Sequence, residues 1–160
     1  MATGMSRTIA GAVLPSERPD HWMMEVWNPL GIVGVISAFN FPAAVAGWNT
    51  ALALICGDAV LWKPALTSNL ITIAIQRILA DVLAKAGFNS IACLCCGDGP
   101  DIGNELVNDK RINLVSFTGS TAVGRQISST VAGRFGKCLL ELGGNNATIV
   151  MPDGDLELAF

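Results

Sequence analysis

The stretch INLVSFTGSTAVG, residues 112–124, is the part of the sequence that most clearly predicts a fold. It begins as a short apolar run, typical of a buried strand, and continues into Thr118-Gly-Ser-Thr121. Val123, Ile127 and Val131 then follow with helical spacing, so a strand passes into a helix through a tight turn with good N-cap residues. Free N–H groups and the positive end of the helix dipole make this turn a candidate anion site.

The same order of strand and helix recurs along the chain. Continuous apolar runs predict strands, and apolar residues three and four apart predict helices. The expected strands are Leu30–Ile36, Asp58–Lys63, Ile91–Cys96 and Ile112–Thr118, with further apolar runs at Lys137–Leu142 and Ala147–Met151. The expected helices are Ala43–Cys56, a long helix capped by Thr67 or Ser68, a short one beginning near Pro100, and the one after Thr121. This alternation predicts an α/β fold, with a parallel sheet and helices on both faces.

The two longer helices of the first half have clear ends and one clear face. Gly57 and Gly87 are placed to end them, Gly57 in a left-handed conformation. The long helix is expected to turn one apolar side to the sheet, namely Ile71, Ala74, Ile75, Ile78, Leu79, Val82 and Leu83.

Polar residues interrupt the pattern where the expected strands end. They are Ser37–Asn40, Lys63, Gly97–Asp101, Thr118–Thr121 and Glu141–Asn146. Ligands of open parallel sheets bind at the carboxyl ends of the strands, so these segments are expected to converge on one site.

The composition limits the class of protein. At 160 residues the chain is long enough for one domain, and its 14% charged and 51% hydrophobic residues give a mean hydropathy of +0.50. Either a membrane protein or the interior part of a larger soluble protein would have this composition. No charge occurs from Val26 to Gly57, but Pro29 and Pro42 interrupt that run, which disfavours a spanning helix. A net charge of −3 gives no basic footprint for nucleic acid.

The two ends of the chain suggest a fragment. Met1–Met5 lacks the basic-then-apolar order of a signal peptide, so a cytoplasmic location is expected. Asp153–Phe160 has the acidic first turn of a helix that is only beginning.

The cysteines predict neither a metal site nor a disulfide framework. They are Cys56, Cys93, Cys95, Cys96 and Cys138. Cys93 and Cys96 form a C-x-x-C within an apolar run, and His21 is the only histidine, so a zinc site lacks ligands. Small buried thiols are the favoured interpretation.

Two phosphate-binding motifs are nearly matched and fail. Gly119–Gln126 resembles the P-loop, but Arg125 stands where the lysine should reach the phosphates, and Gln126 replaces the hydroxyl that holds magnesium. Gly97, Gly99 and Gly103 have one residue too many for G-x-G-x-x-G. A dinucleotide would therefore use another variant of the strand–turn–helix site.

Three strand-end residues have both a structural and a chemical interpretation. Lys63 is either a solvated surface lysine or a cation that reaches ribose hydroxyls or phosphate. Glu141 is either a solvent-facing strand end or a general base beside glycines that let a ligand approach. Asn40 is either a turn residue or a donor to a developing oxyanion. The residues alone leave these alternatives open.

A resemblance to a known family selects among them. Phe39-Asn-Phe-Pro42, Trp62-Lys-Pro-Ala65, Phe117–Thr121 and Glu141-Leu-Gly-Gly144 occur in this order and spacing in the aldehyde dehydrogenase superfamily. Further stretches, above all Glu141–Asn146, resemble the antiquitin branch, the α-aminoadipic semialdehyde dehydrogenases. The resemblance implies a Rossmann-like cofactor-binding domain and NAD(P)-dependent oxidation of an aldehyde to a carboxylic acid. In that chemistry a cysteine thiolate attacks the aldehyde, hydride passes to the nicotinamide, and water releases the thioester.

The resemblance also implies roles for individual residues. Asn40 and Glu141 would be catalytic, as oxyanion donor and as base. The implied cofactor-binding residues are Lys63 at the adenosine ribose, Gly119 and Ser120 at the pyrophosphate, Gly99 and Gly103 on the adenine side, Phe39 and Leu142 near the pyrophosphate–nicotinamide half, and Ser37, Val123 and Gly143 beside them. The cofactor would be NAD, with NADP possible because Leu66 stands where many NAD-preferring members carry a ribose-binding glutamate.

The nucleophilic cysteine of this family lies in a loop beyond Glu141, and none of the five cysteines matches it. We therefore expect residues 27–160 to be an NAD(P)-binding domain without a nucleophile, and residues 1–26 to be an arm of the oligomerisation segment. The parent enzyme would be a cytoplasmic homotetramer acting on a small aldehyde, away from membrane and nucleic acid. A non-catalytic dinucleotide-binding module is the alternative.

Overall fold

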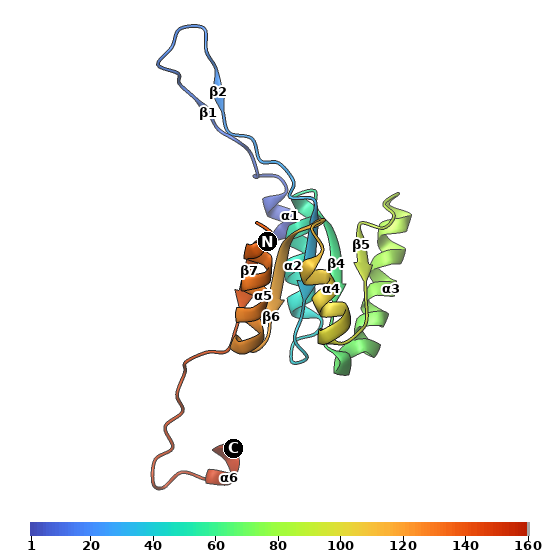
Figure 1. Ribbon diagram of the computed structural model, residues 1–160, viewed down its shortest axis with the longest axis vertical. Helices are drawn as coiled ribbons and strands as arrows, with labels where there is room; N and C mark the ends of the chain where they lie inside the picture. The colour runs from blue at the N-terminus through green and yellow to red at the C-terminus, as the bar shows by residue number, and fades with distance from the viewer. Residues whose placement is uncertain (160) are drawn as a thin grey trace.

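A five-stranded, wholly parallel sheet forms the centre of the molecule (Figure 1). The computed structural model describes residues 1–159. The strand order is β5-β4-β3-β6-β7, and the strands are β3 (Ile32–Ile36), β4 (Ala59–Lys63), β5 (Ala92–Leu94), β6 (Ile112–Thr118) and β7 (Lys137–Glu141). The predicted α/β fold, a Rossmann-like parallel sheet with helices on both faces, is confirmed.

The helices divide between the two faces of the sheet. On one face α2 (Ala44–Ile55) packs on β3 and β4, and α3 (Asn69–Lys85) packs on β5. On the other face α5 (Thr121–Gly133) lies on β6 and β7, beside α4 (Asn104–Asn108). A 3₁₀ turn, Leu66–Ser68, leads into α3, and a π-helical turn, Gly99–Gly103, leads into α4.

Each face of the sheet has its own core, because successive strand residues point to opposite sides. Val33 and Val35 of β3 pack with Ala46, Ala53, Val60 and Trp62 under α2. Val115 and Phe117 of β6 pack with Leu106, Val107, Ile127 and Val131 under α4 and α5. Val35 and Val115 are completely buried, so the central strands are covered on both sides, as their continuous apolar sequences predict.

The order in which strands are added to the sheet changes direction at the boundary between the neighbouring strands β3 and β6. From β3 the chain moves outward to β4 and β5, and then it returns to the other side of β3 to form β6 and β7. The carboxyl ends of β3 and β6 therefore flank a topological switch point, where open α/β sheets bind their ligands. This is the edge at which the polar strand ends were expected to converge.

Glycines end the two helices that were expected to stop there. Gly57 and Gly87 have φ values of +82° and +83°, directly after the C-caps of α2 and α3. The left-handed end predicted for Gly57 is confirmed.

Two predictions about α3 are correct only in part. Ser68 is the N-cap residue, as predicted, but its hydroxyl donates to the carbonyl of Ala65 at 2.9 Å and makes no cap hydrogen bond to the helix. The side facing the sheet is centred on Thr72, which is completely buried, and on Gln76, whose amide donates to the Ala92 carbonyl at 2.7 Å. Of the predicted apolar side, Ile75, Leu79 and Leu83 are half-buried, and Ile75 packs on the core under α2. The other four residues, Ile71, Ala74, Ile78 and Val82, are exposed.

The prediction of buried thiols is also wrong. All five cysteines are free, but Cys56 and Cys96 are exposed and Cys93, Cys95 and Cys138 are only partly covered. The reason is their position: β5 is an edge strand of three residues that carries the C-L-C-C run past its own end, Cys138 lies in β7 at the other edge of the sheet, and Cys56 is the C-cap of α2.

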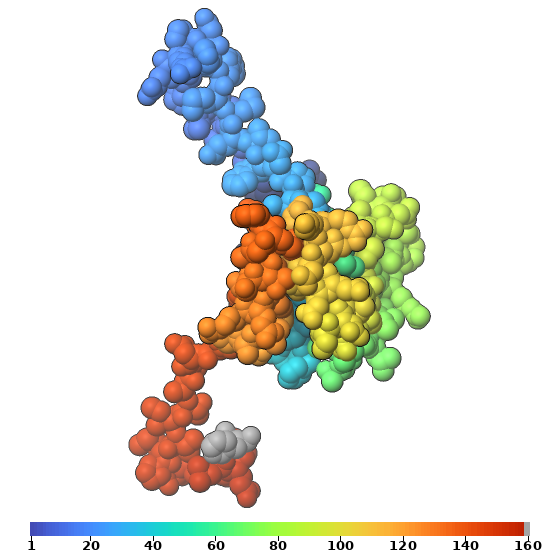
Figure 2. All heavy atoms as spheres, in the orientation of Figure 1, coloured from blue at the N-terminus to red at the C-terminus, as the bar shows by residue number. Residues whose placement is uncertain are grey.

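A hairpin near the N-terminus and the segment after β7 extend away from the sheet, whereas the N-terminal residues themselves contact α2 (Figure 1). Residues 1–26 contain α1 (Ala2–Met5) and a two-stranded antiparallel hairpin of β1 (Val13–Leu14) and β2 (Met23–Met24), which projects as a narrow arm (Figures 1 and 2). The apolar run Ala147–Met151 forms no strand; it belongs to an extended segment that leads to α6 (Leu156–Ala159) on the opposite side of the molecule. The division into an arm and a binding domain stays a prediction.

The apolar stretch Val26–Gly57 is divided into β3, a loop and α2. By length and composition alone, the helical segment Leu66–Lys85 is the one among the described residues that could cross a membrane. Its buried Thr72 and its Gln76–Ala92 hydrogen bond place one side of it on the sheet.

Candidate functional site

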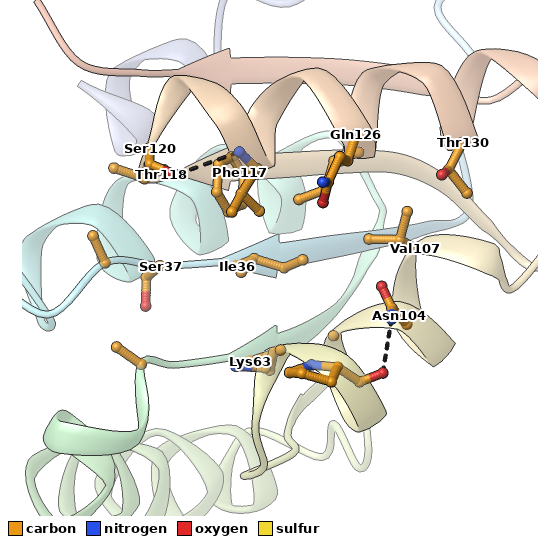
Figure 3. Close-up of a pocket in the computed structure, with 18 of the residues that line it drawn as sticks. Ile36, Ser37, Lys63, Asn104, Val107, Phe117, Thr118, Ser120, Gln126 and Thr130 are labelled. Atoms are coloured by element: carbon orange, nitrogen blue, oxygen red, sulfur yellow. Dashed lines mark hydrogen bonds between the residues drawn. The ribbon is translucent and has the colours of Figure 1, made fainter.

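An elongated cavity of about 570 Å³ opens at the switch point, within the size range of small-molecule sites (Figure 3). Its walls come from the ends of β3, β4 and β6, from the π-helical turn and α4, and from α5. Figure 3 shows Ser37, Thr118 and Ser120 toward one end, and Asn104, Val107 and Thr130 toward the other. Eight of the predicted cofactor-binding residues line it: Ser37, Phe39, Lys63, Gly99, Gly103, Gly119, Ser120 and Val123.

The first turn of α5 forms one end of this cavity. Ser120 is the N-cap, and its hydroxyl oxygen accepts from the backbone N–H of Val123 at 3.3 Å. The cap predicted for this turn is confirmed. The N–H of Gly119 donates to the carbonyl of Glu141 at 3.1 Å, so that N–H holds the turn against β7. The dipole and the remaining N–H groups of the first turn still favour an anion here.

Lys63 is buried in the wall of the cavity and is only 5% exposed. Its ammonium donates to the carbonyl of Pro64 at 2.9 Å. Burial lowers the pKa of Lys63, and the nearby Cys95, Asp98 and Cys96 oppose that shift. The interpretation as a solvated surface lysine is therefore wrong; a partly desolvated cation faces a cavity, which suits an anionic or hydroxyl-rich ligand.

Ser37 lines the cavity and also takes part in a buried hydrogen bond. The indole N–H of Trp62 donates to its hydroxyl oxygen at 2.8 Å, and both side chains are buried. The hydroxyl can still donate its own hydrogen, since a hydroxyl both accepts and donates.

Replacing Ser37 with alanine is expected to destabilise the fold by about 1–3 kcal/mol, because the Trp62 N–H loses its partner in a buried place. Urea unfolding measures this. Ser6→Ala, at an exposed hydroxyl of the arm, is the control and should change the free energy of unfolding little. Equal stability of Ser37→Ala and the unaltered protein would contradict the role of this bond.

The residues expected to be catalytic lie outside the cavity. Asn40 is exposed in the loop between β3 and α2, and Glu141 is exposed at the end of β7. Glu141 is not enclosed by apolar side chains, as a base in an apolar pocket would be. Asn40 follows β3 and Glu141 ends β7, so both residues share the edge of the sheet that holds the cavity without lining it. Their catalytic roles stay predictions.

Leu142 and Gly143 also lie beside the cavity. Leu142 packs on α5, where a β-carbon added to Gly124 would come within 2.4 Å of its Cδ2. A β-carbon added to Gly143 would lie 3.7 Å from the hydroxyl of Thr121, at the start of α5. They therefore support the first turn of α5 from the β7 side.

Part of the lining was missed from the sequence. Ala38, Pro100 and Thr118 lie in segments that were expected to converge on the site, although no role was predicted for them. The lining residues outside those segments are Ile36, Ala65, Asn104, Val107, Phe117, Gln126, Ile127 and Thr130. The helical spacing of Val123, Ile127 and Thr130 on α5 could have indicated them, because residues three and four apart share a face. Gln126 was considered only as a failed P-loop residue. Within residues 1–159, His, Cys, Asp and Glu side chains form no cluster able to hold a metal ion.

An anion-favouring helix start and a buried cation lie on one cavity at the switch point of a parallel sheet, an arrangement typical of nucleotide-binding α/β folds. Comparison with known proteins is more specific. The family model described as "Aldehyde dehydrogenase family" matches residues 1–160. The chain belongs to the aldehyde dehydrogenase family.

Its curated relatives include the semialdehyde dehydrogenases of the predicted branch. The chain is 57% identical over 159 residues to aldehyde dehydrogenase family 7 member B4 of Arabidopsis thaliana, covering 99% of this chain and 31% of that protein. It is 55% identical over 158 residues to the α-aminoadipic semialdehyde dehydrogenase of Bos taurus, covering 98% and 29%. The chain thus spans less than a third of the length of these relatives.

Solved structures of the family have the same fold. The glyceraldehyde-3-phosphate dehydrogenase of Methanocaldococcus jannaschii, complexed with NADP, matches with a TM-score of 0.85 and 33% identity, over 98% of this chain and 34% of that one. The betaine aldehyde dehydrogenase of Staphylococcus aureus, in complex with NAD⁺, matches with a TM-score of 0.83 and 33% identity, over 99% and 31%.

Proposed function

We propose that this chain is the cofactor-binding part of an NAD(P)-dependent aldehyde dehydrogenase, and that the cavity at the switch point holds the dinucleotide. The observation that carries the proposal is the pairing of two features on one cavity: the first turn of α5 and the buried ammonium of Lys63. Two similar structures of the family were solved with NADP and NAD⁺, which supports the choice of ligand.

The residues present fit such a ligand. The capped first turn of α5 suits a pyrophosphate, and Lys63 suits ribose hydroxyls. Gly103 lies against Lys63: a β-carbon added there would be 3.6 Å from the Cε of Lys63, so glycine leaves the wall open beside the cation. When bound, NAD(P) supplies a hydride acceptor for aldehyde oxidation.

The chain's own part in catalysis would be to orient and to move protons. Asn40 would donate a hydrogen bond to the developing oxyanion, and Glu141 would act as the base for thiol or water. The nucleophilic cysteine would lie beyond residue 160, as the resemblance to the family implies, since none of the five cysteines matches the family's nucleophile loop. The relatives named for α-aminoadipic semialdehyde make a semialdehyde the favoured substrate.

Calorimetric titration tests the proposal. The 160-residue chain is expected to bind NAD⁺ and to produce no NADH with propanal or a semialdehyde. Failure to bind either NAD⁺ or NADP would contradict the assignment of the cavity, and NADH production would contradict the missing nucleophile. Binding without turnover by the full-length protein would favour the non-catalytic dinucleotide-binding module instead.

The choice between NAD and NADP is measured in the same titration. Leu66 is exposed directly after Ala65 of the cavity wall, so no carboxylate stands at this position to repel a 2′-phosphate. Leu66→Glu is expected to weaken NADP binding more than NAD⁺ binding.

The affinity for NAD⁺ is expected to fall as pH rises, starting below the pH at which an ordinary lysine titrates. Burial lowers the pKa of Lys63 in the free protein, and a bound dinucleotide, which is anionic, would raise it. Below the free-protein pKa, Lys63 is charged in both states and contributes fully; above the pKa of the complex, its charge contributes nothing. Titration at several pH values measures this, and Lys63→Met should remove the dependence. The same slope in that variant would contradict the assignment.

We propose a cytoplasmic homotetramer for the parent enzyme, with residues 1–26 contributing an arm to its assembly. The projecting hairpin supports the second part, and five free cysteines are compatible with a reducing compartment. Deleting residues 1–26 from the full-length protein should lower its mass in sedimentation; an unchanged tetramer would contradict the role of the arm.

A further inference from the structure

The end of the cavity away from the start of α5 combines apolar walls with polar side chains whose chemistry has not been assigned. Val107 and Ile127 are buried there and leave an apolar surface between α4 and α5. Asn104 of α4, and Gln126 and Thr130 of α5, line the same region (Figure 3). A planar base with polar edges fits such a slot, because its faces contact apolar atoms while its edge meets hydrogen-bonding groups.

We propose that Asn104 reads the base of the dinucleotide by accepting a hydrogen bond from the 6-amino group of adenine. This inference rests on the proposed dinucleotide function, and it adds a residue that determines base specificity.

The orientation of the Asn104 amide is set by the protein. Its Nδ2 donates to the carbonyl of Pro100 at 2.8 Å, in the π-helical turn one helical turn earlier. A carbonyl oxygen can only accept, so the nitrogen must face it and Oδ1 must face the other way. Figure 3 shows the amide oxygen on the side away from that bond, toward α5. The protein therefore presents an acceptor to the cavity.

A fixed acceptor distinguishes two bases of nearly the same shape. Adenine carries an amino group at position 6, which donates; hypoxanthine carries an oxygen there, which only accepts. Oδ1 would accept a hydrogen bond from the amino group of adenine. Against hypoxanthine, Oδ1 would meet the oxygen at position 6, so the hydrogen bond would be lost and both acceptors would be partly desolvated.

The other polar residues of this end cannot discriminate in the same way. Gln126 is exposed, as Asn104 is, but no hydrogen bond to residues 1–159 holds its amide, which can turn to offer either its oxygen or its nitrogen. The hydroxyl of Thr130 both donates and accepts. Either side chain would adapt to adenine or to hypoxanthine, so the selectivity falls to Asn104.

The test is the ratio of two dissociation constants, for NAD⁺ and for nicotinamide hypoxanthine dinucleotide, measured by titration calorimetry on the chain. The unaltered protein is expected to prefer the adenine form by about 5–10-fold, the value of one neutral hydrogen bond gained or lost. Asn104→Leu should bring the ratio close to one. Gln126→Leu should weaken both ligands and preserve the ratio.

Asn108→Leu is the matched control. Asn108 stands one turn later on α4, outside this cavity, and its Nδ2 makes the same kind of bond, to the carbonyl of Asn104 at 2.8 Å. Its removal should leave the ratio unchanged, and thermal unfolding of each variant reports whether α4 is intact.

Each outcome decides. Equal binding of the two dinucleotides by the unaltered protein, or a preference retained in Asn104→Leu, overturns the role of Asn104 and leaves the proposed function standing. Binding of neither dinucleotide overturns the proposed function itself.

Discussion

Replacing Lys63 with methionine is expected to weaken NAD⁺ binding by at least about tenfold, the effect of losing one hydrogen bond from a charged donor. Lys63 lies buried in the cavity wall, and this burial disfavours its charged form and lowers its pKa. A bound dinucleotide would offset that cost by giving the ammonium hydroxyl and anionic partners, so the affinity depends on the charge.

The same substitution should leave the free energy of unfolding within about 1 kcal/mol of the original, because the lost bond to Pro64 is offset by removal of a desolvated charge. Calorimetry and urea unfolding on one sample measure both effects. Lys85→Met removes an exposed lysine that pairs with Asp81, and it should change neither quantity appreciably. An unchanged NAD⁺ affinity in Lys63→Met would contradict a role for Lys63 in binding the dinucleotide.

Replacing Gly34 with alanine is expected to lower the free energy of unfolding by about 1–3 kcal/mol, the usual cost of overpacking a core. Gly34 lies in the middle of β3, and a β-carbon there would come within 2.7 Å of Leu106 Cδ2 and 3.0 Å of Ile112 Cγ2. Both neighbours are buried, so they have little room to move. Because Leu106 belongs to α4, the displacement should also reach the cavity wall and weaken NAD⁺ binding.

Gly47→Ala is the control for this substitution. Gly47 lies within α2, where an added β-carbon meets no atom within 4 Å. Alanine there should be neutral or should stabilise the helix by about 0.5–1 kcal/mol. Urea unfolding of both variants compares the same chemical change in a crowded and an open place. Equal stability of the two would contradict the close packing of α4 on β3.

The position of the site was predictable because it follows from topology. Lys63 ends β4, Ser120 follows β6 and the Gly99–Gly103 turn follows β5, and a parallel sheet brings these strand ends to one edge, whatever their separation in the chain. The Ser120 cap and the left-handed Gly57 were predictable because each depends on a few neighbouring residues.

The details that failed depend on packing across the sheet. The apolar spacing of α3 admits more than one inner face, and the choice of Thr72 and Gln76 follows from how the helix crosses β5. Leucine and isoleucine outnumber the inner positions there, so the hydrophobic pattern alone predicts a face that is too wide and includes exposed residues. Asn104 gave no signal, because a single asparagine in a short helix is common and only its bond to Pro100 fixes its amide.

The Trp62–Ser37 bond gives the protein an internal optical reporter. Trp22, Trp27 and Trp48 are exposed, whereas Trp62 is only 3% exposed and its indole bonds to a serine of the cavity wall. Iodide should therefore quench the emission of the first three and leave a blue-shifted component from Trp62. A ligand that forms a hydrogen bond with the Ser37 hydroxyl would shift this remaining Trp62 emission. Occupancy of the cavity can therefore be followed by fluorescence without a label.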